Sequence, residues 1–217
     1  MAKQIQQEFA QLLEQAQLSL LPATIKNLIR YIELLDKWNH AYNLTAIREQ
    51  RDMLTWHLMD SLAIGPYLQG QRFVDVGTGP GLPGIPLALV YPEQEWTLVE
   101  SNRKKCQFLL QAVLSLGIKN IKLVQERAEA LVPETCFDAV VTRAFASLAD
   151  MLTMTQHLCC PGGQFIAMKG EYPTAELDAL PAGFKAIAVH PLSVVGLAAQ
   201  RHVVVIEKNK VSSPLVG

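Results

Sequence analysis

The sequence has little charge and no long apolar run. Charged residues make up 18% of the 217 residues, and the formal net charge is -1. Such a chain has no global field that draws it onto nucleic acid, so any RNA binding requires a local basic patch. Its apolar runs are far shorter than the ~20 residues of a membrane-spanning helix, and the polar start at Met1 has no apolar signal segment. We therefore expect a soluble, cytoplasmic protein with no membrane partner.

Cysteine is scarce and its spacing does not suit a metal site. The four cysteines are Cys106, Cys136, Cys159 and Cys160. No pair has the C-x-x-C spacing, and two adjacent cysteines do not easily close a zinc site. The histidines show no ligand spacing either. We expect no bound metal, and thiols that suit a reducing cytosol.

Half of the residues are hydrophobic, which is enough for one sizeable core with a small appended subdomain. Within the first 65 residues, apolar side chains recur every three to four positions, which predicts helices over 5–16, 25–38 and 51–64. These segments form a predicted helical cap over residues 1–66. Trp38 and Trp56 are most simply core residues of this cap.

Beyond the cap, short apolar runs alternate with helical stretches, of which Arg103–Leu116 is the clearest. This alternation predicts an α/β fold with a mostly parallel sheet covered on both faces, over residues 67–210. Residues 211–217 read as a loose tail. The predicted strands, the last two forming a late hairpin, are 73–76, 96–99, 121–124, 137–141, 164–168, 185–190 and 202–207.

A glycine-rich loop follows the first predicted strand. Asp75 precedes the loop, whose glycines are Gly77, Gly79 and Gly81. Glycines allow a sharp turn and a close approach of ligand. Dinucleotide-binding loops have the spacing G-x-G-x-x-G, whereas this loop is G-x-G-x-G and has Leu82 after the third glycine. The spacing favours S-adenosylmethionine, although such turns also occur as plain connectors between strand and helix.

Two further segments support a nucleoside cofactor. Glu100 ends the next strand, where a carboxylate can accept hydrogen bonds from both ribose hydroxyls. Ala128 and Glu129 follow the third strand, where a backbone N–H and a polar side chain could contact the adenine edge. Loop, acid and spacing together therefore predict a cofactor site at the carboxyl ends of the first three strands.

Four segments together resemble the ribosomal RNA small subunit methyltransferase G family, also called glucose-inhibited division protein B. They are FVDVGTGPGLPGIPLA at 73–88, NLT at 43–45 with HLMDS at 57–61, VVTRAFA at 140–146, and MKG at 168–170. Their order along the chain is that of the family, and the helical cap belongs to the family as well. The resemblance implies a class I S-adenosylmethionine methyltransferase with a seven-stranded Rossmann-like sheet.

The resemblance also implies an activity, which is methyl transfer to N7 of one guanine, guanine 527, in 16S rRNA of the small ribosomal subunit. It implies cofactor contacts at Gly77, Leu82, Ala128, Glu129 and Arg143. The family often has an aromatic residue at the Leu82 position, so the contact there is apolar but differs in detail.

The same resemblance places cations around cofactor and RNA. They are Arg127, Arg143 and Lys169, of which Arg143 and Lys169 are expected to position the reactants. His57, taken alone, reads as a buried, hydrogen-bonded histidine, and the resemblance favours a role in lining the RNA site or anchoring the cap. Phe145 could stack on the target base or fill the core, and the sequence does not choose.

The chemistry of N7 agrees with the residues that are present. Guanine N7 carries no proton, so its methylation needs neither a general base nor a covalent intermediate. Enzymes that methylate base amines often have an Asn/Asp-Pro-Pro-Tyr/Phe motif after the fourth strand, where this chain has Thr142–Phe145. No cysteine closely follows that strand, which disfavours methylation of pyrimidine carbon 5. We therefore expect no acid or base catalyst, and a monomer acting on rRNA.

Three other functions stay open at this point. The acceptor could be another RNA, a protein or a small molecule, because the fold does not choose its acceptor. A nicotinamide oxidoreductase is disfavoured by Leu82 in place of a third glycine. A non-catalytic RNA-binding module would not need both Glu100 and the glycine loop. Further basic residues, Arg201 among them, could either bind RNA or lie on the surface as solvated charges.

Overall fold

A single mixed sheet forms the centre of the protein, in a computed structural model that describes residues 2–143, 145 and 147–209. Within this part of the chain the strand order is β3-β2-β1-β4-β5-β7-β6. Strands β1 to β5 are parallel, and β7 runs antiparallel to β5 and β6. The predicted seven-stranded, mostly parallel sheet with a late hairpin is confirmed. The strands are β1 (Arg72–Val76), β2 (Glu95–Val99), β3 (Ile121–Val124), β4 (Phe137–Arg143), β5 (Cys159–Lys169), β6 (Phe184–Pro191) and β7 (His202–Lys208).

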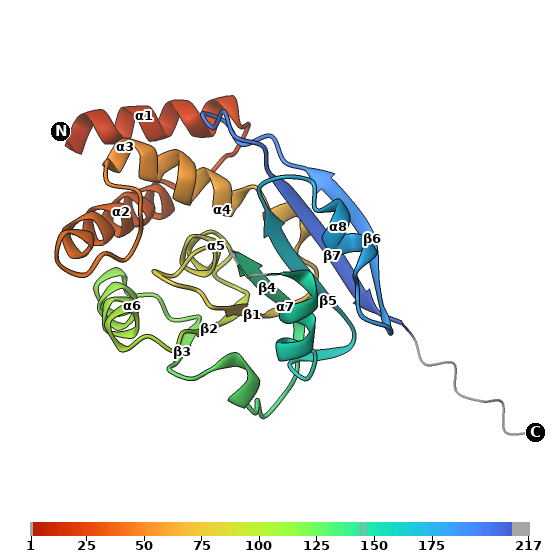
Figure 1. Cartoon of the computed structure of the whole chain (residues 1–217). Coiled ribbons are helices and arrows are strands. Elements are labelled where there is room, and N and C mark those ends of the chain that lie inside the picture. Colours follow the sequence, from red (N-terminus) through yellow and green to blue (C-terminus); the bar gives the residue numbers. More distant parts are fainter. Residues whose placement is uncertain (1, 144, 146, 210–217) are drawn as a thin grey trace, which may run out of the picture.

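Successive residues of each central strand enter two different hydrophobic clusters. In β4, Ala139 and Val141 belong to one cluster and Val140 to the other. Because side chains alternate across a strand, this division means that the sheet buries both of its faces. Helices cover the two faces in Figure 1, with α5 and α6 on the side of the cap and α7 on the other side.

The N-terminal segment is helical, as predicted. It consists of α1 (Ala2–Gln15), α2 (Pro22–Tyr42), α3 (Gln50–Met53), a π-helical segment η1 (Leu54–Met59) and α4 (Asp60–Leu62). Helix α2 begins at a proline, which has no backbone N–H to leave unpaired. The last predicted helix, 51–64, is thus one helical segment with a π-turn at its centre, a feature that often marks functional sites. These elements lie together in Figure 1, at its red and orange end. The division at residue 66 stays a prediction, and the tail 211–217 lies outside the described residues.

The remaining helices connect the strands. They are η2 (Gly65–Tyr67), α5 (Gly84–Val90), α6 (Arg103–Leu116), η3 (Ala128–Ala130), α7 (Leu148–Thr155) and α8 (Thr174–Asp178). Helix α6 has the bounds predicted from the sequence. The Asn102 side chain accepts hydrogen bonds from the Lys104 and Lys105 N–H groups at its start, and Gly117 ends it with φ +65°. Both features are common helix caps.

The expectation of free thiols is wrong for two of the four cysteines. Cys136 and Cys160 form a disulfide, with their Cα atoms 4.9 Å apart. They are 24 residues apart in the sequence, and the parallel pairing of β4 with β5 brings them together, since Phe137 pairs with Cys159. Spacing along the chain did not reveal this proximity. Cys106 and Cys159 are free. Within the described residues, no helix has the length and apolarity needed to cross a membrane.

Candidate active site

The glycine loop lies between β1 and α5. Its three glycines have positive φ angles, +66° at Gly77, +60° at Gly79 and +97° at Gly81. A Cβ atom at Gly77 or Gly79 would meet no atom of the described residues within 4 Å, whereas a Cβ at Gly81 would collide with Ile85 Cδ1. Gly81 therefore allows close packing of the loop on α5. Gly77 and Gly79 leave open space, which is the form of a cradle for a ligand.

Asp75 braces this loop from inside the protein. Its Oδ2 accepts hydrogen bonds from the Thr78 hydroxyl at 2.6 Å and from the Gly84 N–H at 2.9 Å. The carboxyl group is fully buried, and burial raises its pKa to about 6. Asp75 thus fixes the two ends of the loop to each other, so that the turn is rigid before any ligand arrives.

Glu100 is in direct contact with the loop. Its Oε2 accepts a hydrogen bond from the Gly79 N–H at 3.0 Å, and its Oε1 accepts one from the Asn102 N–H at 2.8 Å. The residue is 8% exposed. Each carboxylate oxygen has two lone pairs, so the group retains capacity to accept the two hydroxyls of a ribose. The loop and the acid therefore form one unit that fits a nucleoside cofactor.

The cap also reaches this loop. The hydroxyl group of Tyr31, a buried residue of α2, donates a hydrogen bond to the Pro80 carbonyl at 2.8 Å. Sequence reasoning did not find this contact, because a tyrosine within an apolar stripe resembles any other core residue. The contact couples the position of the cap to the position of the loop.

The other predicted cofactor residues have mixed surroundings. Ala128 is buried at the start of η3, next to the exposed Glu129, and Arg127 precedes them and is also exposed. Leu82 is 2% exposed and belongs to the large hydrophobic cluster between cap and sheet. Their contacts with a cofactor stay predictions.

A cavity of about 410 Å³ lies where the cap meets the carboxyl ends of β4 and β5. It collects most of the residues that the sequence assigned to RNA binding, including His57, Arg143 and Lys169, together with Phe145. Arg127 is not among its lining residues. Among the residues that the structure describes, the lining is Ile47, Trp56, His57, Asp60, Arg143, Phe145, Met168, Lys169, Gly170 and Arg201.

Asp60 joins two arginines in the wall of this cavity. Its Oδ2 lies 3.3 Å from Arg143 Nη1, and its Oδ1 accepts a hydrogen bond from Arg201 Nε at 2.8 Å. Arg143 Nη1 also donates to the Trp56 carbonyl at 3.1 Å. The Asp60 side chain is 3% exposed. Asp60 therefore bonds the cap to the sheet, because its partners end β4 and precede β7.

The lining carries a net positive charge. Arg143, Lys169 and Arg201 contribute three positive charges, and Asp60 contributes one negative charge. Lys169 Nζ donates to both carboxylate oxygens of Glu176, at 3.0 and 2.8 Å. The Glu176 carboxylate also accepts the Leu148 N–H at 2.7 Å. When Glu176 is counted as well, the cavity wall still has a net charge of one positive unit. The whole chain, by contrast, has a formal net charge of -1.

His57 forms part of a polar network within the cap. Its Nε2 lies 2.9 Å from the Thr45 hydroxyl, and the Thr45 N–H donates to the Asn39 side chain. The residue is 3% exposed. Burial, with the nearby positive charge of Arg143, lowers the pKa of His57 to about 4. His57 is therefore neutral at neutral pH, and it both lines the cavity and anchors the cap.

We expect the His57→Gln variant to lose part of the pH dependence of stability. Between pH 6.5 and 4, His57 binds a proton in the unfolded chain but stays neutral in the folded protein. The free energy of unfolding therefore falls as the pH falls through this range. Asp75, with its raised pKa, has the opposite effect on the free energy of unfolding between about pH 4 and 6, but both proteins contain Asp75, so its effect cancels in the comparison. Urea unfolding measures the free energy of unfolding of both proteins. The difference between the native protein and the variant should decrease by about 2–3 kcal/mol from pH 7 to 4.5. A difference in free energy of unfolding that does not change with pH would contradict the burial of a neutral His57.

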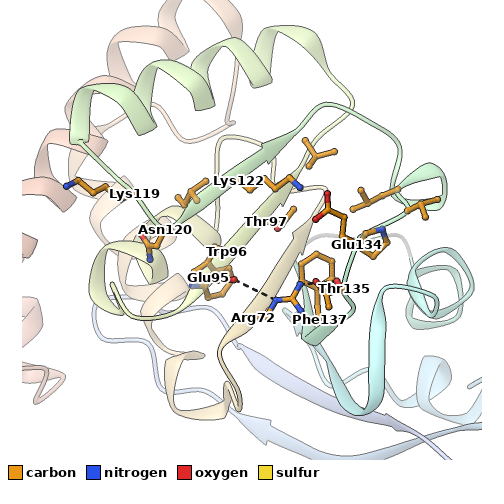
Figure 2. A pocket seen from close by; sticks show the side chains of 15 residues that line it. Arg72, Glu95, Trp96, Thr97, Lys119, Asn120, Lys122, Glu134, Thr135 and Phe137 are labelled. Carbon is orange, nitrogen blue, oxygen red and sulfur yellow. Dashed lines mark hydrogen bonds and ion pairs between the residues drawn. The ribbon is translucent and has the colours of Figure 1, made fainter.

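A second cleft, of about 470 Å³, lies at the other end of the sheet, where the parallel strands begin. Figure 2 shows that residues at the amino ends of strands line it, among them Arg72, Glu95 and Phe137. Arg72 spans it, 3.7 Å from the Glu95 carboxylate and 5.6 Å above the Phe137 ring. Ligands of open α/β sheets bind at the carboxyl ends of the strands. The candidate active site is therefore the cavity beside the glycine loop.

One residue of that cavity contradicts the sequence prediction. Trp56, expected in the core of the cap, is 36% exposed and lines the cavity. The π-helical segment η1 contains both Trp56 and His57, and of the two it is His57 that is buried. The sequence reading of His57 as a buried, hydrogen-bonded histidine is confirmed, whereas the reading of Trp56 as a core residue is wrong.

This fold, with a glycine loop and an acid at the end of β2, defines a class I methyltransferase. Among solved structures, the chain is similar to the ribosomal protein L11 methylase of Lactobacillus delbrueckii subsp. bulgaricus. The TM-score is 0.54 at 19% identity, covering 70% of this chain and 77% of that one. A likeness at this level of identity bears on the fold.

The model of the rRNA small subunit methyltransferase G family matches residues 24–204. Relatives named ribosomal RNA small subunit methyltransferase G are similar over nearly the whole chain. The protein of Edwardsiella ictaluri is 51% identical, covering 91% of this chain and 97% of its own. The protein of Idiomarina loihiensis is 49% identical, covering 91% and 96%. The chain belongs to the rRNA small subunit methyltransferase G family.

Proposed function

We propose that this protein transfers a methyl group from S-adenosylmethionine to N7 of guanine 527 in 16S rRNA of the small ribosomal subunit. The observation that carries the proposal is the positively charged cavity beside an open glycine cradle. The two adjoin because β1 and β4 are paired in parallel and end at the same edge of the sheet. Arg143 of the cavity is also near enough to Asp75 of the loop for its positive charge to oppose in part the rise that burial causes in the pKa of that carboxyl group.

The cradle fits the proposed methyl donor. Gly77 and Gly79 would face its methionine end and ribose, and Glu100 would accept hydrogen bonds from the ribose hydroxyls. Ala128 and Glu129 would contact the adenine edge. When bound, S-adenosylmethionine supplies an electrophilic methyl group on a positively charged sulfur.

The residues of the cavity suit an acceptor that has no proton to lose. His57, the titratable ring of the cavity, is buried and neutral, and it is bonded to Thr45. Bound S-adenosylmethionine would supply the methyl carbon to guanine N7 and would keep the electron pair of the broken bond on its sulfur. No base is needed in this exchange. The protein contributes position, with Arg143 and Lys169 holding the RNA so that N7 and methyl are in line, and alignment of this kind can lower a barrier by several kcal/mol.

The proposed setting follows from the same family. The relatives described above are bacterial proteins named for small subunit rRNA, so we place this chain in a bacterial cytoplasm with 16S rRNA or the small subunit as its partner. We propose that it acts as a monomer, since the cap and the sheet of one chain together enclose the cavity.

Methyl transfer to small ribosomal subunits that lack their own modification tests this proposal. We expect one methyl group per subunit, mapped to N7 of guanine 527, and no transfer to subunits already modified there. Labelling of an adenine amine, a pyrimidine carbon, a protein or a small molecule would assign a different acceptor. Failure to bind S-adenosylmethionine would remove the methyltransferase proposal altogether.

A further inference from the structure

Trp56 and Arg201 form a cation–π pair in the wall of the candidate active site. The Arg201 guanidinium carbon lies 5.0 Å from the centroid of the Trp56 ring, within the range of a cation–π contact. Both residues line the 410 Å³ cavity. Neither the pair nor its geometry is apparent from the sequence, where 145 positions separate the two residues.

The guanidinium is held in place from several directions. Arg201 Nε donates to Asp60 Oδ1 at 2.8 Å, and Nη1 donates to the Gln200 carbonyl at 2.8 Å. The side chain is 16% exposed. A Cβ atom added at Gly170, which also lines the cavity, would lie 3.9 Å from Arg201 Nη1, so the glycine leaves space beside the guanidinium. An arginine fixed in this way gives up little further freedom when it receives a ligand.

The arrangement differs from that of an arginine that binds phosphate. A phosphate-binding arginine offers a free fork of N–H groups to the oxygens, whereas Arg201 directs Nε and one Nη into protein acceptors. Both residues line the cavity, so the pair brings a planar guanidinium and an indole ring to its wall. Unstacked RNA bases stack on arginine planes and aromatic rings of this kind.

We propose that Arg201, backed by Trp56 and fixed by Asp60, is the platform on which the acceptor base stacks. The inference rests on the proposed function, since it concerns the base that receives the methyl group. Arg143, bonded to the other oxygen of Asp60 and to the Trp56 carbonyl, connects this platform to the end of β4. The platform therefore has a fixed position relative to the glycine loop, as in-line transfer to N7 requires.

The Arg201→Lys variant tests the platform, because it keeps the charge and removes the plane. We expect kcat/KM for small ribosomal subunits to fall about 10-fold or more, since one stacked base contributes roughly a 5- to 150-fold effect. The Kd for S-adenosylmethionine should stay as in the native protein. The slope of log KM against log salt concentration should also stay the same, because no phosphate contact is lost. Arg30→Lys is the matched control, since Arg30 bonds the Ser115 carbonyl outside this cavity.

A second variant, Trp56→Leu, tests the same platform while it keeps the side chains of Asp60, Arg143 and Arg201. We expect a similar loss in kcat/KM. Because the two residues act as a unit, kcat/KM of the double variant should lie within about twofold of the value for Arg201→Lys alone. If Arg201→Lys stays within twofold of the native protein while Arg201→Gln loses activity and flattens the salt slope, Arg201 binds phosphate and the platform is wrong. Full activity of Trp56→Leu would equally overturn it. Absence of any transfer by the native protein would instead count against the proposed function.

Discussion

Gly79→Val is expected to weaken binding of S-adenosylmethionine by ~100-fold or more, which corresponds to ~3 kcal/mol. Gly79 has φ +60°, and a Cβ there would meet no protein atom within 4 Å. The valine methyl groups would therefore occupy the open side of the loop without clashing with the protein, and the loss would come from exclusion of the ligand. Isothermal titration calorimetry with S-adenosylmethionine measures this directly.

The control for this variant is Gly117→Val. Gly117 has φ +65°, and a Cβ there would also meet nothing within 4 Å, but the residue ends α6 away from the loop. A β-branched residue in this backbone region costs about 1–2 kcal/mol at either position. Gly117→Val should thus lose stability and retain native cofactor affinity. Equal affinities of the two variants would show that the loop does not hold the methyl donor.

Glu100→Ala is expected to have a comparable effect by a different route. The carboxylate accepts the N–H groups of Gly79 and Asn102, and in the proposal it also accepts the ribose hydroxyls. Its removal leaves two N–H groups without their partner and removes the ribose contact, so we expect cofactor affinity to fall ~100-fold. Loss of one hydrogen bond to a charged group typically costs about 1.5–3 kcal/mol, which is enough to account for most of this loss of affinity. Glu95→Ala, at the exposed other end of the same strand, should bind as the native protein does.

A deoxyribose analogue of S-adenosylhomocysteine separates the ribose contact from loosening of the loop. The native protein should bind the analogue more weakly than the parent compound, because Glu100 loses one donor. Glu100→Ala should bind both compounds equally weakly. If the variant distinguishes the two compounds as well as the native protein does, Glu100 supports the loop only and another group binds the ribose.

The sequence allowed prediction of the sheet and the glycine loop because both depend on local patterns. The strands β1 to β4 are short apolar runs, and α6 carries its own caps at Asn102 and Gly117. The contact of Glu100 with the loop agrees with the expectation of an acid opposite the glycines. These features follow from residue types within a few positions of one another.

Contacts between distant segments were not predictable in the same way. The disulfide of Cys136 with Cys160 depends on the pairing of β4 with β5. The bond from Tyr31 to Pro80 and the meeting of Trp56 with Arg201 depend on where the cap lies against the sheet. Trp56 lies in the π-helical segment η1, and apolar periodicity does not reveal such a segment. Four of the ten described residues that line the cavity come from the cap, so its form required the tertiary structure.

The most direct test of the central claim is a crystal structure of the protein with S-adenosylhomocysteine. The account predicts both ribose hydroxyls within hydrogen-bonding distance of the Glu100 carboxylate, and the amino-acid end of the ligand against Gly77 and Gly79. The sulfur should face the cavity lined by Arg143, Lys169 and Arg201. A ligand bound at the cleft around Arg72, or at any site away from the glycine loop, would contradict the account.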